Sequence, residues 1–340
     1  MQKTILIPPE APAILGSAAV VGKREHEGPL GDLFDFHDDT DRFGMETWEQ
    51  SEAAMQHTAL NLALAKAKMK PDELDALLAG DLINQCVSST FGLLAFDVPQ
   101  IGLYGACSTI AEGLGLAALL VGAGTLRRAA AVTSSHNCSA ERQFRFPLEY
   151  GGQRTPTSQW TVTGSAAFLI GKSKTGPYLS DVMFGRSIDP GITDANNMGA
   201  AMAPAAVDTL TRYFRASHTL PCQYDLIVTG DLGAEGHAIV LEQTAKAGFD
   251  LSEVYNDCGL LIFHRGQQDV HAGGSGCGCS AAVLSAYLLK RMREGALKNI
   301  LFVGTGALMS PLSVKQGQSI PGIAHLVHIT SERVGYAGEA

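Results

Sequence analysis

The chain has 340 residues, of which 46% are hydrophobic and 17% charged, and its formal net charge is −9. This is enough apolar material for one large domain or for two fused halves. The negative balance, without a basic tract interleaved with aromatic residues, argues against nucleic acid as a partner. Seven cysteines are an odd number for a disulfide framework, so we expect reduced thiols in a cytoplasmic compartment.

The apolar segments predict no membrane span. The first residues carry one lysine and a short apolar run before Pro8, a pattern that is not typical of a secretory signal. The longest largely apolar stretch, Gly113 to Leu126, is too short to cross a bilayer and predicts a buried helix. We therefore expect any contact with a membrane to be peripheral.

Short apolar runs alternate with helical patterns along the first half, which favours a mixed α/β fold with buried strands. We predict, in chain order, a strand over 13–21, a polar loop over 28–44, a helix over 48–68, a strand over 74–79, a helix over 110–126, a strand over 129–134, an irregular polar and aromatic insertion over 135–160, and a strand over 161–170.

The second half repeats this order. The predicted elements are a helix over 201–216, strands over 225–229 and 259–263, a glycine-rich turn over 273–278, a helix over 280–294 and a strand over 299–303. The apolar runs 75–82 and 225–232 both end in Gly-Asp-Leu, and Cys107 and Cys279 each open a small-residue helix. A repeat this long indicates a duplicated half-domain, with halves over 1–172 and 173–340.

Cys107 stands directly before the predicted helix over 110–126. Unpaired amides and the positive end of the helix dipole lower the pKa of a thiol in that position. We therefore interpret Cys107 as a candidate nucleophile. The alternative is a buried cysteine that serves as a small hydrophobic residue.

The duplicated halves and several motifs point to a known family. The motifs are Tyr104-Gly-Ala-Cys-Ser-Thr109, Ser134-Ser-His-Asn137, Glu141-Arg-Gln-Phe-Arg-Phe-Pro147, Glu149-Tyr-Gly-Gly-Gln153, Gln159-Trp-Thr-Val-Thr-Gly164 and Gly273-Gly-Ser-Gly-Cys-Gly-Cys-Ser280. The chain resembles the thiolase and ketoacyl-synthase fold and, within it, the stage V sporulation protein AD family of spore-forming bacteria. The resemblance implies a five-layer α/β/α/β/α fold, a homodimer, and binding of dipicolinic acid, free or as its calcium chelate, for uptake into the developing spore.

The resemblance also raises the question of catalysis. Decarboxylative enzymes of this fold pair the nucleophilic cysteine with a His and with an Asn or second His. Those positions fall near Asp231 and Gly278 here, and neither side chain donates a hydrogen bond to an oxyanion. The chain therefore favours a binding protein on a degenerate enzyme scaffold. An acyltransferase that loads Cys107 remains the alternative, with Cys277 or Cys279 in the part of a second thiolase cysteine.

A flat, aromatic, dianionic ligand is complemented by helix-start amides, cations and aromatic faces. We predict that the insertion lines a pocket together with Cys107. The predicted ligand-binding residues are Cys107, Ser108, Thr109, His136, Asn137, Arg142, Gln159, Trp160, Asp231 and Gly278. Membrane proteins of the same sporulation system are expected as partners, which places the protein in the cytoplasm, peripheral to the inner spore membrane.

Plainer interpretations stay open for several of these residues. Arg142 and Arg145 also suit surface ion pairs, Trp160 suits core or dimer packing, and His136 suits a structural histidine. A zinc site at Cys277 and Cys279 with Cys258 and His271 lacks the C-x-x-C spacing. The acidic run over 37–41 lacks the twelve-residue calcium loop, so no metal site and no cofactor are predicted.

Overall fold

The fold is described from a computed structural model for residues 5–144 and 154–334. Within them, eleven strands form one sheet in the order β10-β9-β12-β13-β8-β1-β7-β5-β3-β4, with β2 on β1, and β11 pairs with β6. The strands are β1 (Ala13–Gly22), β2 (Phe36–Asp38), β3 (Ala76–Gly80), β4 (Gln100–Gly102), β5 (Arg128–Ser135), β6 (Trp160–Thr161), β7 (Gly164–Gly171), β8 (Tyr178–Met183), β9 (Leu226–Thr229), β10 (Tyr255–Asp257), β11 (Gly274–Ser275), β12 (Asn299–Ala307) and β13 (Gly322–Thr330).

Helices cover this sheet in several groups. They are α1 (Lys23–His26), α2 (Trp48–Ala67), α3 (Val87–Leu93), α4 (Thr109–Gly122), α5 (Asn137–Phe144), α6 (Met198–Ser217), α7 (Gly233–Lys246), α8 (Cys258–Leu261), α9 (Cys277–Val283), α10 (Leu289–Arg293) and α11 (Pro311–Lys315). A π-helical turn over Leu284–Leu288 joins α9 to α10, so these form one continuous helical segment.

The strand order repeats between the two parts of the chain. One part runs β4-β3-β5-β7-β1 and the other β10-β9-β12-β13-β8, and in both the first three strands are parallel and the last two antiparallel to their neighbours. The parts meet through the single pair Ala13 and Tyr178. The two Gly-Asp-Leu motifs follow β3 and β9, which hold equivalent places. The boundary between 172 and 173 stays a prediction; it falls between β7 and β8.

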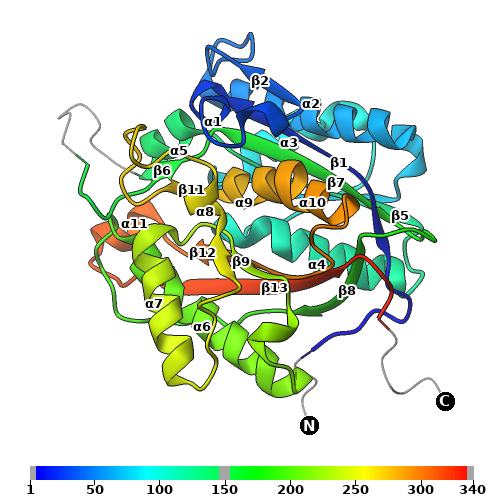
Figure 1. Ribbon diagram of the computed structural model, residues 1–340. Helices are drawn as coiled ribbons and strands as arrows, with labels where there is room; N and C mark the ends of the chain where they lie inside the picture. The colour runs from blue at the N-terminus through cyan, green and yellow to red at the C-terminus, as the bar shows by residue number, and fades with distance from the viewer. Residues whose placement is uncertain (1–4, 145–153, 335–340) are drawn as a thin grey trace.

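The elements stack in five layers, as the sequence predicts (Figure 1). Helices α2 and α3 cover one outer face, α6 and α7 cover the other, and α4 and α9 lie between the two parts of the sheet. Small residues allow this central packing. A Cβ on Gly115 of α4 would lie 2.8 Å from Val182 Cγ1, so a larger residue would push α4 away from β8.

One element differs in kind from its prediction. The apolar run over 259–263 is not a strand, because residues Cys258–Leu261 form helix α8. Asp257 caps this helix by accepting a hydrogen bond from the Gly259 amide at 3.0 Å. Periodicity cannot separate a short buried helix from a strand.

Other differences concern bounds and omissions. The predicted helix over 110–126 ends at Gly122, and the helix predicted from 280 begins at Cys277. The insertion begins with helix α5, and strands β8 and β13 and helix α7 had no counterpart in the prediction. Residues 5–144 and 154–334 contain no helix that is long and apolar enough to cross a bilayer.

Candidate functional site

Cys107 lies in a 3₁₀ turn (Ala106–Ser108) that leads directly into α4. Its side chain is only 6% exposed and packs with Leu82, Ala140 and Cys277, and with the partly buried Phe144. Leu82 follows β3, Cys277 opens α9, and Ala140 and Phe144 belong to α5. We call these five side chains, with Asp231, the Cys107 chamber. The chamber therefore joins both repeated parts of the chain and the start of the insertion.

Asp231 supplies the charge in this chamber. Its carboxylate accepts hydrogen bonds from the Gly276 amide at 2.8 Å, from Ser275 Oγ at 3.1 Å and from Thr305 Oγ1 at 2.8 Å. The Cys107 thiol is close enough to this carboxylate for the two groups to affect each other's pKa. Burial raises the pKa of Asp231, and its hydrogen bonds oppose that rise. The negative charge of Asp231 therefore favours the protonated form of the thiol.

The Cys107 thiol is a poor nucleophile in this setting. Burial raises the pKa of Cys107 well above its ordinary value, and the negative charge of Asp231 raises it further. The predicted lowering of this pKa is therefore wrong. The helix-start amides do not face the thiol freely: the Ser108 amide donates to Gly105 O at 3.1 Å and the Thr109 amide to Ala106 O.

The side chains of Ser108 and Thr109 also form hydrogen bonds within this turn. Ser108 Oγ donates to Gly105 O at 2.6 Å, and Thr109 Oγ1 donates to Ala106 O at 2.7 Å. Both residues are buried. Their role as ligand-binding residues stays a prediction, and a ligand would first have to replace these contacts.

The start of α9 closes the chamber from the opposite side. The Cys277 thiol donates to Ala106 O at 3.1 Å, and burial raises the pKa of Cys277 well above its ordinary value. The Gly278 amide donates to Ser135 Oγ at 3.0 Å, and a Cβ at Gly278 would lie 2.3 Å from Gly164 O. Only glycine fits there, which accounts for part of the glycine-rich turn by packing alone.

Two buried acids, Asp81 and Glu52, lie in the first half of the chain, where Asp81 holds the place that Asp231 holds in the second half. Asp81, after β3, accepts hydrogen bonds from the Ser89 amide at 2.8 Å and from Ser89 Oγ at 2.6 Å. Glu52 of α2 accepts from Ser134 Oγ at 2.9 Å and Ser139 Oγ at 2.7 Å. Burial and the nearby charge of Asp81 raise the pKa of Glu52 to about 8. Sequence reasoning did not single out this pair, although the repeated Gly-Asp-Leu motif marks Asp81.

The opposite face of α5 borders an open cleft of about 380 Å³. Three predicted ligand-binding residues, Asn137, Arg142 and Trp160, come together there. Among the described residues, the lining is Trp48, Asn137, Cys138, Glu141, Arg142, Arg154 and Trp160, and we call it the arginine cleft. It contains both tryptophans of the chain. The sequence had marked the insertion, which contains Arg154, but it had singled out neither Arg154 nor Trp48, which lies far from the insertion along the chain.

The remaining predicted residues lie elsewhere. His136 is buried; its Nδ1 accepts from the Cys138 amide at 3.1 Å, so Nε2 donates to Asp41 O at 2.8 Å. Burial lowers the pKa of His136, which keeps the ring neutral. Gln159 Nε2 donates to the carbonyls of Asp231 and Gly274, both at 2.7 Å. Arg145 lies outside the described residues.

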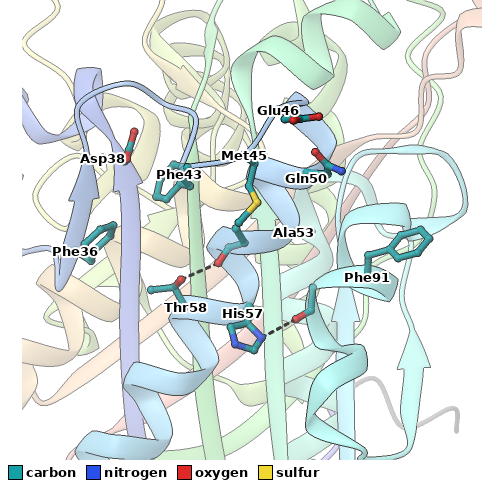
Figure 2. Close-up of a pocket in the computed structure, with 13 residues that line it drawn as sticks. Phe36, Asp38, Phe43, Met45, Glu46, Gln50, Ala53, His57, Thr58 and Phe91 are labelled. Atoms are coloured by element: carbon teal, nitrogen blue, oxygen red, sulfur yellow. Dashed lines mark hydrogen bonds between the residues drawn. The ribbon is translucent and has the colours of Figure 1, made fainter.

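A larger groove of about 660 Å³ lies at the start of α2 and beside α3 (Figure 2). Phe36, Phe43, Met45 and Phe91 surround it, and His57 hydrogen-bonds to Gly92 O at 3.3 Å. Its described lining contains no lysine or arginine. The groove therefore lacks the charge that an anionic ligand requires.

The acidic loop at the edge of this groove is organised by its own hydrogen bonds. Asp38 Oδ1 accepts from the amide and the hydroxyl of Thr40, at 2.8 Å and 2.5 Å. Among the residues that the structure describes, no group of three or more His, Cys, Asp or Glu side chains is placed to hold a metal ion.

The fold is that of thiolase-like proteins. Similar solved structures include a 3-oxoacyl-[acyl-carrier-protein] synthase III from Aquifex aeolicus (TM-score 0.55, 13% identity, 93% of this chain and 99% of that one). A variant of OleA from Xanthomonas campestris gives a TM-score of 0.58 at 16% identity, over 95% of this chain and 99% of that one. Identities this low show the fold alone.

The sequence comparisons are more specific. Residues 2–330 match the family described as Stage V sporulation protein AD (SpoVAD). The chain is also 43% identical over 329 residues to stage V sporulation protein AD of Bacillus subtilis, covering 96% of each chain. The chain therefore belongs to the stage V sporulation protein AD family.

Proposed function

We propose that this protein binds dipicolinic acid, free or as its calcium chelate, and serves the uptake of that ligand into the developing spore. Membership of a sporulation family supports the biological setting. The ligand follows from the resemblance of the motifs around Cys107 and the insertion. In this proposal the protein works as a homodimer beside membrane proteins of the same sporulation system, in the cytoplasm and peripheral to the inner spore membrane.

The observation that carries the proposal is the state of the Cys107 thiol. Acyl transfer on this fold needs a thiolate and hydrogen-bond donors that stabilise an oxyanion. Here burial and the negative charge of Asp231 raise the pKa of the Cys107 thiol. A carboxylate in that place opposes developing negative charge instead of stabilising it. The arrangement supports a binding protein that retains the thiolase-like fold without acyl-transfer activity.

Isothermal titration calorimetry tests the binding function directly. Dipicolinate added to the protein, with and without calcium, is expected to give saturable binding in at least one of the two titrations. An absence of saturable heat in both titrations would overturn the proposal.

Mass spectrometry after incubation with acyl-CoA compounds tests the enzymatic alternative. We expect no thioester on Cys107, because the thiol is protonated and buried. An adduct on Cys107 that forms and then turns over would instead establish an acyltransferase.

A further inference from the structure

We propose that the groove at the start of α2, which we call the α2 groove, docks a cytoplasmic segment of an integral membrane protein, one that carries apolar side chains flanked by lysine or arginine. The groove runs from β2 and the loop after it, across the first turns of α2, to α3 (Figure 2). The inference rests on the proposed function, because only that proposal makes membrane proteins partners of this chain. It assigns their contact a place on the fold.

The walls of the α2 groove are large apolar side chains that water reaches. Phe36 of β2 is 45% exposed, Met45 is 43% exposed and Phe91 of α3 is 69% exposed. The Phe36 and Phe43 rings lie 6.3 Å apart at a tilt, on the side opposite Phe91 (Figure 2). Apolar groups gathered in one exposed place mark a surface that another molecule covers.

The lining between these walls consists of small residues and is fixed by packing. Ala53 and Ala54 of α2 and Gly92 of α3 belong to it. A Cβ on Gly92 would lie 2.5 Å from Ala53 O, so α3 lies directly against α2. The first turn of α2 is capped by Thr47, whose Oγ1 accepts a hydrogen bond from the Gln50 amide at 3.3 Å. The groove is therefore preformed, and docking needs little rearrangement of this chain.

The polar part of the lining is acidic. Asp38 and Glu46 belong to it, and the described lining contains no lysine or arginine. Burial opposes ionisation of Asp38, but hydrogen bonds from Thr40 and from nearby backbone amides lower its pKa overall, so this carboxylate is charged at neutral pH. Arg42 of the same loop is engaged elsewhere: its guanidinium lies 3.3 Å from the centre of the Trp48 ring, and its Nη1 donates to the Glu46 carbonyl oxygen at 2.7 Å. The groove therefore presents apolar and negative groups together.

A segment that complements this surface is apolar on one side and basic around it. Cytoplasmic loops of integral membrane proteins carry an excess of lysine and arginine. Amphipathic segments bind by laying their apolar face into a groove of the partner. Opposite charges speed the encounter and disfavour wrong partners. The α2 groove therefore fits the class of partner that the proposed function requires.

A second copy of this chain fits the groove less well. In a two-fold contact the same patch meets itself, so Asp38 and Glu46 would face the same acids of the other copy. Like charges across an interface oppose association. The charge of the groove therefore favours a basic partner over self-association at this place.

Fluorescence anisotropy with two labelled peptides tests the docking without any substitution. Both peptides carry the same leucine face in a helical pattern, and the polar face is lysine in one and glutamate in the other. We expect saturable binding of the lysine peptide and roughly tenfold weaker binding of the glutamate peptide. Absent binding of the lysine peptide, or equal binding of both, would overturn the docking. A saturable dipicolinate titration on the same sample would then show that the proposed function stands without it.

Phe91→Ser tests the apolar wall. The side chain is exposed, so we expect the variant to fold and to lose roughly tenfold in affinity for the lysine peptide. Leu220→Ser is the matched control, because Leu220 is 56% exposed, follows α6 and lies outside the described lining. Equal affinity of the two variants for the lysine peptide would sink the role of this wall.

Glu46→Lys tests the charge of the groove. The lysine peptide should bind this variant more weakly and the glutamate peptide more tightly than the wild type, a reversal that a loss of structure does not produce. An unchanged ratio of the two affinities would overturn the role of charge. Sedimentation velocity of Phe91→Ser covers the other occupant: we expect the wild-type oligomeric state, and a lower one would assign the groove to contact between copies and overturn the choice of partner.

Discussion

Two faces of helix α5 border two very different sites. Ala140 and Phe144 cover the closed Cys107 chamber, while Asn137, Glu141 and Arg142 line the open arginine cleft. The spacing follows the helical period, since residues four apart lie on one face. One site holds a protonated thiol beside a carboxylate, and the other holds cations and indole rings. The contrast teaches that one short helix can border two chemically opposite environments.

The largest expected effect is a loss of stability on substitution of Gly278, which packs tightly at the start of α9. In Gly278→Ala the new Cβ would lie 2.3 Å from Gly164 O, and the backbone must move. We expect a loss of about 3 kcal/mol or more in the free energy of unfolding, measured by chemical denaturation. Gly102→Ala on the edge strand β4 is the control, because nothing lies within 4 Å of that Cβ. Equal stability of the two variants would contradict the packing described for the chamber.

The substitution Asp231→Asn changes the charge of the chamber. It removes acceptor capacity that Gly276, Ser275 and Thr305 use, and we expect about 1–3 kcal/mol of destabilisation. It also removes a charge that raises the pKa of Cys107, so iodoacetamide should label that thiol faster than in the wild type.

The exposed Cys222 is an internal reference for this labelling, which mass spectrometry follows. In the wild type Cys222 should react and Cys107 should resist. Wild-type Cys107 that reacts as fast as Cys222 would show that the thiol is neither closed off nor held protonated.

The pH dependence of stability reports on the buried acid of the first half. The pKa of Glu52 is about 8 in the folded protein, against an ordinary value of 4.5. The folded state therefore keeps a proton that the unfolded state loses, and stability falls as the pH rises from about 4.5 to about 8. The decline is about 1.4 kcal/mol per pH unit for each such group.

Glu52→Gln should make the loss of stability between about pH 4.5 and 8 less steep, because glutamine does not ionise. Thermal unfolding across this pH range measures the change. Glu25→Gln is a matched variant, because burial also raises the pKa of Glu25 to about 8 at a separate place in the fold. A decline that stays as steep in Glu52→Gln as in the wild type would show that Glu52 ionises normally.

The smallest expected effect sharpens the account of the arginine cleft. Arg42 stacks on Trp48 but does not line the cleft. Arg42→Gln should weaken dipicolinate binding by about 0.5–1 kcal/mol, the scale of an exposed cation–π contact and of a nearby charge. Fluorescence titration measures the change. Unchanged affinity would show that the contact between Arg42 and Trp48 takes no part in binding.

The sequence by itself determined the duplicated halves, the five-layer class and the family. Those features are written in local patterns: apolar runs, helix periods, the repeated Gly-Asp-Leu motif at Asp81 and Asp231, and the motifs around Cys107. It also predicted that Asn137, Arg142 and Trp160, which all lie in one insertion, come together, and the structure places them around one cleft; their role in binding a ligand stays a prediction.

Only the tertiary structure decided the chemistry of these residues. The pKa of Cys107 depends on burial and on Asp231, which lies 124 positions away along the chain. His136 is engaged by the backbone of Asp41 and Cys138 rather than by the cleft. Trp48 joins the insertion through packing that no local pattern encodes. Desolvation and charge act through space, so the sequence fixes the candidates while the fold assigns their roles.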